Sequence, residues 1–149
     1  MRRIVTTVLA ACIGLTGSIT PAGADLFTRT AKVIAILADE LFTGEAEGHL
    51  GGAGTLAIRS QKKPDLTCVG RFATSDLGGS GQMRCSDGST ATFDFQRLSL
   101  FRGHGVGSFS RGSMSFAYGL TAEEAGPYLK LPPGKKLAQN GAGLELVDL

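Results

Sequence analysis

Glycine is the feature that most constrains the fold of this chain, because glycines alternate with large side chains at a period of two from Gly44 to Leu120. The sequence holds 22 glycines in 149 residues, and 19 of them lie after Ala24, about twice the usual share of roughly 7%. They follow no collagen-like period of three, and an apolar content of 42% is too high for a flexible linker or a disordered chain. A period of two is typical of β-strands. The pattern therefore predicts a β domain built of glycine-rich hairpins.

Three segments are variants of one unit, and together they suggest a degenerate internal repeat. They span residues 44–59, 68–95 and 103–120. Leu50–Leu56 aligns with Leu77–Met83 at an offset of 27 residues, and Arg111–Met114 repeats the end of that pattern. Repeats at 20 to 50 residues indicate supersecondary units that stack on one another. Each unit is predicted to form one hairpin.

The turns suggest a pairing for the second and third hairpins. A turn near Asp76-Leu77 places Cys68 opposite Cys85 and Phe72 opposite Gly81. A turn at Arg111-Gly112 places Phe109 opposite Met114 and Gly107 opposite Phe116. Aromatic rings would then shield the glycine positions of the neighbouring strand, namely Gly81 under Phe72 and Gly107 under Phe116.

The dipeptide Asp87-Gly88 predicts a tight turn between two further strands. A strict two-residue turn pairs Cys85 with Thr90, which puts Phe93 on the opposite face from Met83. Two explanations stay open. Either both faces of the sheet are covered, or a β-bulge shifts the register by one residue.

The segments on either side of the hairpins have different patterns. Residues 25–43 carry apolar side chains at three-, four- and seven-residue spacings, which predicts a short N-terminal helix, although Val33–Leu37 equally fits a buried strand. Thr121–Glu124 fits a capping box that opens one helical turn, and Leu144–Leu149 fits a final strand or a loose tail. The predicted fold class is mainly β: an antiparallel meander of hairpins over 44–120, as a single curved sheet or a small open barrel. The N-terminal helix precedes it and a C-terminal cap and tail over 121–149 follow it.

The first 24 residues have the composition of a secretory signal peptide. Arg2 and Arg3 provide the positive start, a charge-free apolar stretch follows, and Ala22–Ala24 gives the small residues before a cleavage site. We expect cleavage between Ala24 and Asp25 and no integral membrane span afterwards, since the apolar stretch is shorter than the ~20 residues a span needs. The alternative is a lipoprotein, in which Cys12 after Leu-Ala-Ala is lipidated and anchors the chain.

The second unit resembles a MORN repeat. The resemblance rests on Gly70-Arg71-Phe72, Gly79-Ser80-Gly81 and Asp87-Gly88. It covers about 28 residues well and about 75 loosely, and Cys68 stands where an aromatic residue is usual. MORN repeats stack hairpins into an elongated curved sheet that serves as a scaffold. The resemblance implies a hairpin architecture and contacts with proteins or lipids, and it supplies no active site.

Cys68 and Cys85 are the two cysteines left once the signal is removed. An even cysteine count in an exported chain favours a disulfide, and the predicted cross-strand position of the two residues agrees. A catalytic cysteine would need a histidine base and a reducing compartment, and neither is indicated.

No spacing of polar residues indicates a catalytic or metal site. His49 and His104 each stand alone beside glycines, and Glu45 and Glu47 alternate on one strand face. The glycine clusters lack the following helix that a phosphate-binding loop requires. We therefore expect no catalytic residue, no cofactor and no metal.

The charge balance excludes the simplest nucleic-acid binder. The 15 basic and 13 acidic residues give a formal charge of +2, and Arg2 and Arg3 account for the excess, so the mature chain is neutral. Nucleic-acid binders normally carry a basic surplus. We expect a periplasmic or secreted binding or envelope-associated module without catalysis, whose partner is a protein or another envelope component. The alternative is a small envelope hydrolase that uses a carboxylate or a histidine in a glycine-lined cleft.

The export signal yields the first testable prediction. The mature protein should begin at Asp25, because the three regions of a signal peptide occur in order before it. The intact mass of the exported protein measures this directly. A mass that includes a diacylated Cys12 would contradict cleavage after Ala24 and establish the lipoprotein alternative.

Overall fold

The computed structural model describes residues 28–141 and 143–149. Eight strands form the main body: β1 Thr28–Leu37, β2 Glu40–His49, β3 Ala53–Ser60, β4 Thr67–Thr74, β5 Gly78–Cys85, β6 Thr90–Ser99, β7 Arg102–Phe109 and β8 Gly112–Tyr118. A short cap follows, made of α1 Ala122–Ala125, the 3₁₀ turn η2 Gly126–Tyr128, and the hairpin of β9 Lys135–Asn140 and β10 Gly143–Asp148. The predicted signal peptide, its cleavage site between Ala24 and Asp25, and Cys12 lie outside the described residues.

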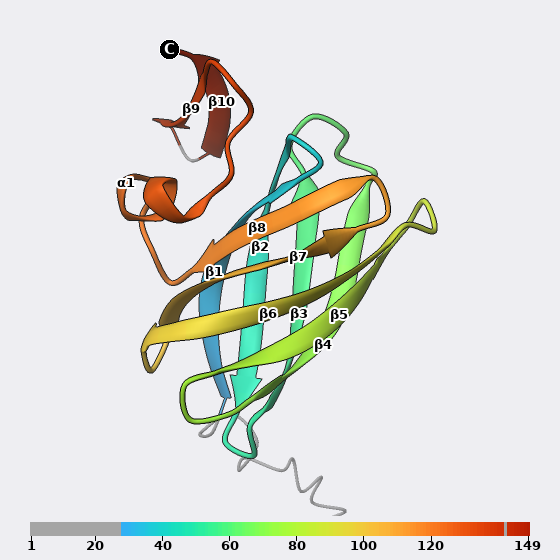
Figure 1. Cartoon of the computed structure of the whole chain (residues 1–149), viewed down its shortest axis with the longest axis vertical. Helices are drawn as coiled ribbons and strands as arrows, with labels where there is room; N and C mark the ends of the chain where they lie inside the picture. The colour runs from blue at the N-terminus through green and yellow to red at the C-terminus, as the bar shows by residue number, and fades with distance from the viewer. Residues whose placement is uncertain (1–27, 142) are drawn as a thin grey trace, which may run out of the picture.

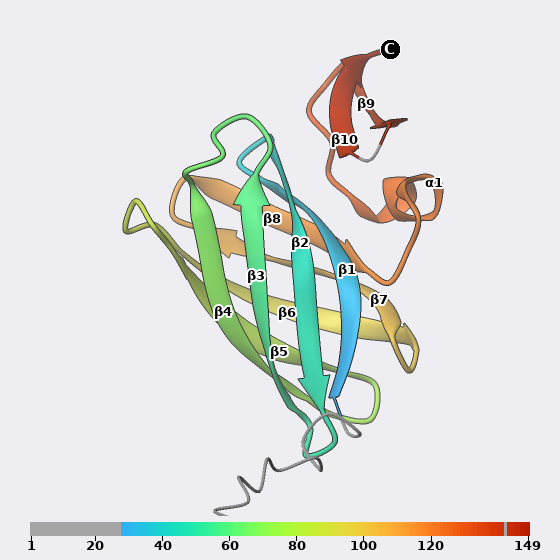
Figure 2. The same cartoon turned by 180° about the vertical axis from the view of Figure 1, so that it is seen from behind.

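The eight strands form one antiparallel meander that closes on itself. Each strand pairs with the next along the chain, and β1 also pairs with β8, from Val33 opposite Tyr118 to Leu37 opposite Met114. The result is a barrel, with β1–β4 on one side and β5–β8 crossing them on the other (Figures 1 and 2). The predicted mainly-β meander of hairpins is confirmed. The predicted single curved sheet or small open barrel is not what forms: the sheet is closed, and this pairing of its first and last strands removes both edges.

The predicted N-terminal helix over 25–43 is wrong for the residues described, which form β1 and the start of β2. The physical reason is that β1 is covered on both faces. Val33, Ala35 and Leu37 face the barrel core, while Ile34 and Ile36 lie under the C-terminal cap. A strand buried on both faces is apolar at consecutive positions, and such a run also satisfies helical spacing. The buried-strand alternative for Val33–Leu37 is therefore correct.

The turn that joins β1 to β2 carries no glycine. Ala38 and Asp39 are its two central residues, with φ angles of 46° and 67°, between the paired residues Leu37 and Glu40. Positive φ at both central positions is the pattern of the type I′ hairpin turn, for which asparagine and glycine are the usual residues. This turn therefore gives almost no signal in the sequence.

The register of the second hairpin is confirmed and that of the third is wrong. Cys68 lies opposite Cys85 and Phe72 opposite Gly81, as predicted. In the third hairpin the turn is Ser110-Arg111, one residue earlier than expected, so Phe109 pairs with Gly112. Phe116 consequently lies opposite Gly105 instead of Gly107. The shift moves each partner by two residues, so the inward and outward faces are unchanged.

A bulged turn between β5 and β6 decides between the two explanations left open for the register after Asp87-Gly88. The Cys85 amide donates to the Ser89 carbonyl at 2.8 Å, and the Gly88 amide donates to the Cys85 carbonyl at 3.0 Å. Gly88 has a φ of 87°, a left-handed conformation that glycine adopts without strain. The extra residue makes Arg84 the partner of Thr90. Phe93 therefore shares the barrel interior with Met83, and the bulge alternative is correct.

One end of the barrel is packed solid. Leu37, Phe42 and Ser60 are almost fully buried there with the disulfide between Cys68 and Cys85. The Ser60 hydroxyl donates to Glu40 Oε1 at 2.5 Å and accepts from the Lys63 amide at 2.9 Å. These two hydrogen bonds compensate the cost of burying the serine hydroxyl.

The C-terminal cap covers the outer face of β1, β2 and β8. Ile34, Ile36 and Leu41 of the barrel pack with Leu120, Ala125 and Leu129, and with leucines of β9 and β10. The predicted capping box is confirmed: Thr121 Oγ1 accepts from the Glu124 amide at 3.2 Å, and Glu124 Oε2 accepts from the Thr121 amide at 3.0 Å. No helix within the described part of the chain is long and apolar enough to cross a membrane.

The disulfide provides a stability prediction. The double variant Cys68→Ala/Cys85→Ala should lower the free energy of unfolding by about 2 to 5 kcal/mol, because the bond restricts the unfolded chain and lies in the packed end. Urea unfolding measures the change, and Ala73→Ser at an exposed position on β4 serves as the control, with an expected change within about 0.5 kcal/mol. Two reactive thiols per chain in unfolded, unreduced mature protein would contradict the bond.

Candidate functional site

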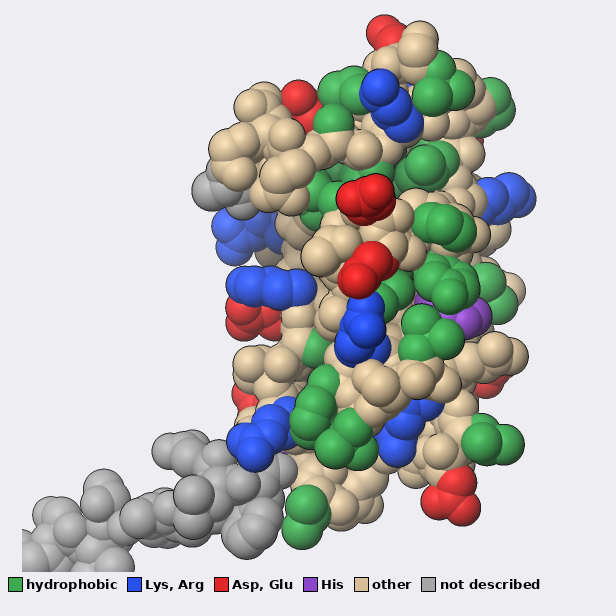
Figure 3. Space-filling view, turned by 90° about the vertical axis from the view of Figure 1, so that its left-hand side faces the viewer, with side chains coloured by type: hydrophobic (Ala, Val, Ile, Leu, Met, Phe, Trp, Pro, Cys, Tyr) green, Lys and Arg blue, Asp and Glu red, His purple; other side chains and the backbone are tan. Residues whose placement is uncertain are grey.

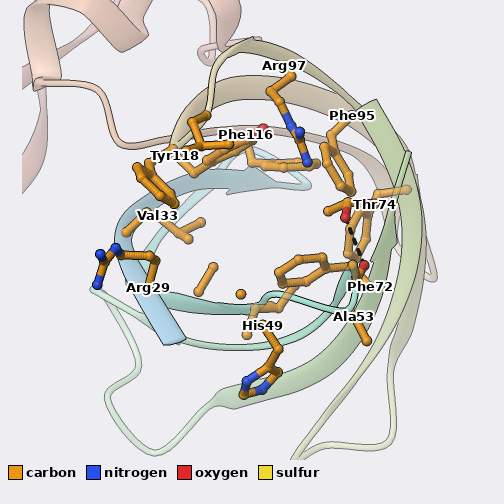
Figure 4. A pocket seen from close by; sticks show the side chains of 18 of the residues that line it. Arg29, Val33, His49, Ala53, Phe72, Thr74, Phe95, Arg97, Phe116 and Tyr118 are labelled. Atoms are coloured by element: carbon orange, nitrogen blue, oxygen red, sulfur yellow. Dashed lines mark hydrogen bonds between the residues drawn. The ribbon is translucent and has the colours of Figure 1, made fainter. Parts of the chain in front are cut away.

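The other end of the barrel is hollow and open. A cavity of about 500 Å³ extends inward from the loops that join β2 to β3, β4 to β5 and β6 to β7. Figure 4 looks into it and shows side chains from several strands around an empty centre. An eight-stranded barrel has an interior that side chains can fill or that can hold one small ligand. This barrel does both, with the filling at one end and the space at the other.

The space exists because one wall carries small residues. Ala31 of β1 lies directly opposite Ala46 of β2, and both line the cavity together with Gly48. Further from the mouth, the inward positions of the same strands hold Val33 and Phe42. The change from large to small side chains along β1 and β2 therefore sets where the packed core stops and the cavity begins.

The opposite wall is aromatic. Three ring pairs meet edge to face: Phe72 with Phe95 at 5.8 Å between centroids, Phe93 with Phe116 at 5.2 Å, and Phe95 with Tyr118 at 5.9 Å. Contacts of this geometry favour one arrangement of the rings. The wall is therefore a continuous and well-defined apolar surface.

Glycines on the neighbouring strands make room for these rings. A Cβ placed on Gly105 would lie only 2.6 Å from Cε1 of Phe116, which real side chains do not tolerate. The predicted arrangement of rings over glycines is thus correct in kind, but Phe116 covers Gly105 instead of Gly107. The earlier turn of the third hairpin accounts for the difference.

The ring of Phe72 also covers a glycine, but not the one predicted. Its side chain faces both Gly54 of β3 and Gly81 of β5 across the sheet. The ring leans over Gly54, and Gly81 is covered by the ring of Phe93. Strand pairing alone does not decide toward which neighbour a ring leans, so the predicted Phe72–Gly81 stacking is wrong although the register is right.

Four titratable side chains besides Tyr118 line the cavity: Arg29, His49, Asp76 and Arg97. Figure 4 shows Arg97 pointing into the barrel, whereas Arg29 and His49 point away from it. Asp76 is exposed on the β4–β5 loop. The guanidinium of Arg97 is therefore the one charge directed toward the interior among the described lining residues.

Tyr118 lies beside Arg97 at the mouth. Burial raises the pKa of the Tyr118 phenol, and the neighbouring Arg97 guanidinium opposes that rise through its charge and a hydrogen bond. The burial effect is the larger, so the phenol keeps its proton throughout the neutral range and can donate a hydrogen bond into the cavity.

The polar residues singled out in the sequence do not point into the cavity. His49 Nε2 lies 3.7 Å from Glu47 Oε1, and Glu45 Oε1 pairs with Lys32 at 2.5 Å, all on the outer surface. His104 stacks on Tyr128 of η2, with ring centroids 4.1 Å apart. Within residues 28–141 and 143–149, no three His, Cys, Asp or Glu side chains gather as a metal site would require.

Exposed apolar side chains surround the mouth. They stand on the three loops at this end and on the adjoining end of β6: Leu50, Leu77, Leu98, Leu100 and Phe101. The loops at the packed end have polar tips instead, such as Ser86–Ser89 and Ser110-Arg111. In Figure 3, hydrophobic and basic side chains lie interspersed over the face shown. The entrance is therefore more apolar than the rest of the loop surface.

Sequence reasoning missed the cavity and Arg97. A signal for the arginine was present, because Ala91, Phe93, Phe95 and Arg97 follow one another at a period of two. That alternation places Arg97 on the interior face once Phe93 is known to be buried. The open register of β6 prevented this inference.

Comparison of the chain with known protein families, curated proteins and solved structures finds no significant match. The resemblance of the second unit to a MORN repeat stays a prediction. The class of protein is therefore defined by its own geometry: an eight-stranded antiparallel barrel with an apolar cavity open at one end.

The environment of Tyr118 yields a pH prediction. In Tyr128→Phe, Tyr118 is the sole tyrosine, and ultraviolet difference spectra should show it losing its proton above the ordinary value of about 10. Because the unfolded chain then releases this proton first, the free energy of unfolding should fall as the pH rises above about 10. In Tyr118→Phe the titration step above pH 10 should be absent. A titration midpoint of Tyr118 at or below pH 10 would contradict the burial of its phenol.

Proposed function

We propose that this protein is an exported, non-catalytic binding module that holds one small, largely apolar molecule inside its barrel. The observation that carries the proposal is the cavity of about 500 Å³ with its apolar walls. Sites for small molecules typically occupy roughly 300 to 1,000 Å³, are concave and mostly apolar, and contain a few polar groups. The cavity has this composition, with aromatic rings on one wall, alanines on the other and Arg97 and Tyr118 at the mouth.

The shape of the interior also supports a ligand. A closed barrel keeps its strands in place, so the cavity is formed before a ligand arrives. Large exposed apolar side chains at one place on a protein commonly indicate a site of interaction. Here Leu50, Leu100 and Phe101 surround the entrance, where an apolar molecule would pass from its source into the barrel.

Export is part of the same proposal. The disulfide between Cys68 and Cys85 suits an oxidising compartment such as the periplasm or the cell exterior. The partner expected from the sequence, a protein or another envelope component, would be the source or the recipient of the ligand.

The alternative, an envelope hydrolase, has less support. It requires a histidine or a carboxylate in a glycine-lined cleft. The His49 side chain lies at the rim and points away from the cavity (Figure 4), His104 stacks on Tyr128, and Asp76 stands exposed at the rim. A general base must lie within hydrogen-bonding reach of the group it activates, and none of these side chains is directed into the cavity.

Filling the cavity tests the proposal. Ala46→Phe should place a ring in the empty space and weaken the binding of the neutral, apolar fluorescent probe phenylnaphthylamine by about tenfold or more, equivalent to at least about 1.4 kcal/mol. Fluorescence titration of the mature protein measures the affinity. Ala57→Phe is the matched control, because Ala57 is on the exposed face of the adjacent strand β3.

The control should bind the probe as the unchanged protein does, and circular dichroism should show that both variants are folded. If the unchanged protein shows no saturable binding, or if both variants bind equally well, the cavity is not the binding site. Ala31→Phe, at the position opposite Ala46, repeats the test from another strand if Ala46→Phe fails to fold.

A further inference from the structure

Arg97 occupies a position where an apolar residue would be expected. The inward residues of β6 are Ala91, Phe93, Phe95 and then Arg97. The first three are buried in the apolar interior, while Arg97 is half-buried at the mouth and its guanidinium points into the cavity (Figure 4). The strand thus leads from an apolar interior to a single positive charge at the entrance.

No carboxylate pairs with this charge among the described residues, and its neighbour at the mouth is the neutral Tyr118 phenol. Other arginines of the chain make ion pairs, Arg102 with Glu124 at 2.8 Å and Arg111 with Asp87 at 3.1 Å. Arg97 belongs to no such pair, and the exposed Asp76 on the cavity rim makes none either. A guanidinium that is partly withdrawn from water without a counter-ion carries a desolvation cost. An anion in the mouth would compensate that cost.

A second donor converges on the same point. Arg97 pairs with Gly103 of β7, and Gly103 pairs with Tyr118 of β8. A Cβ on Gly103 would lie 2.5 Å from Cζ of Tyr118, so the missing side chain lets the phenol lie across β7 toward Arg97. The guanidinium supplies a planar fork of N–H donors and the phenol supplies an O–H donor. This combination matches the two oxygens of a carboxylate.

We propose that the ligand is an aliphatic monocarboxylate, whose carboxylate is held by Arg97 and Tyr118 at the mouth and whose chain lies among Phe93, Phe95 and Phe116. The proposal rests on the proposed function and names the class of molecule bound. Arg97 and Phe93 are four positions apart on β6, which is about 13 Å along a strand. The available depth therefore suits a chain of medium length, and decanoate is the probe of choice.

The test compares a charged and a neutral head group on the same ten-carbon alkyl chain. Displacement of phenylnaphthylamine should show that the unchanged protein binds decanoate about tenfold more tightly than decanol, which corresponds to one charge-assisted interaction of about 1.4 kcal/mol. In Arg97→Gln the affinity for decanoate should fall to that for decanol, and the affinity for decanol should stay within about twofold. Arg97→Lys should keep part of the preference, since the charge is retained and the planar fork is lost.

Arg29→Gln is the matched control. Arg29 lines the same mouth, and the variant removes the same positive charge as Arg97→Gln does. The Arg29 side chain points away from the cavity, however (Figure 4), and its guanidinium lies 6.0 Å from the centre of the Phe101 ring. The variant should keep the full preference for decanoate. If Arg97 had only a structural role, its replacement would weaken the binding of decanoate and of decanol alike. The ratio of the two affinities therefore distinguishes a structural role from contact with the carboxylate.

The outcomes separate this proposal from the function on which it depends. If decanoate and decanol displace the dye equally well and Arg97→Gln changes neither, the barrel binds apolar chains but the carboxylate assignment is wrong. If Arg29→Gln abolishes the preference as fully as Arg97→Gln does, a general positive potential is responsible and the assigned contact is refuted. If neither compound nor the dye binds, the proposed function itself fails.

Discussion

The pairing of β1 with β8 is the interaction on which the rest of the structure depends. It runs from Val33 opposite Tyr118 to Leu37 opposite Met114, and it turns a meander of hairpins into a closed barrel. Without it the sheet would have two free edges, each a row of unpaired backbone groups open to other chains. The same pairing brings the small wall of β1 and β2 across from the aromatic wall and places Tyr118 at the mouth. The cavity therefore exists only because the barrel closes.

The interior divides into a filled half and an empty half because side-chain size changes along the strands. Near the packed end, Leu37, Phe42 and the disulfide between Cys68 and Cys85 leave no space. Near the mouth, Ala31 and Ala46 leave room that the rings of the opposite wall do not reach. Gly103 and Gly105 of β7 serve this division, since each lets an aromatic ring of β8 lie against bare backbone. A protein that holds a ligand must leave part of its interior unfilled, and the packed end stabilises the part that stays open.

The sequence predicted several features that depend on neighbouring strands and on local turns. The register of Cys68–Cys85, the disulfide and the capping box at Thr121 are local in this sense, and all three are confirmed. Of the two alternatives for the C-terminal leucines, the strand is correct. The β1–β2 hairpin was mistaken for a helix because its turn at Ala38-Asp39 carries no glycine and both faces of β1 are apolar. The cap that covers the outer face is about a hundred residues away in the chain, so no local pattern shows that β1 has two buried faces. Arg97 was overlooked for a related reason: the bulge at Gly88 decides which residues of β6 face inward.

The amino-acid sequence by itself determined that this chain is mainly β, that its glycines alternate with large side chains, and that two cysteines meet across one hairpin. These properties follow from a period of two and from short turns, which act over a few residues. Only the tertiary structure decided that the sheet closes, that one end is filled and the other hollow, and that Arg97 and Tyr118 face the same opening. The first and last strands of the barrel are about eighty residues apart in the chain, and the contacts between them depend on the accumulated twist and register of every strand between. A cavity is a property of that closure, and it has no counterpart in any single segment of the sequence.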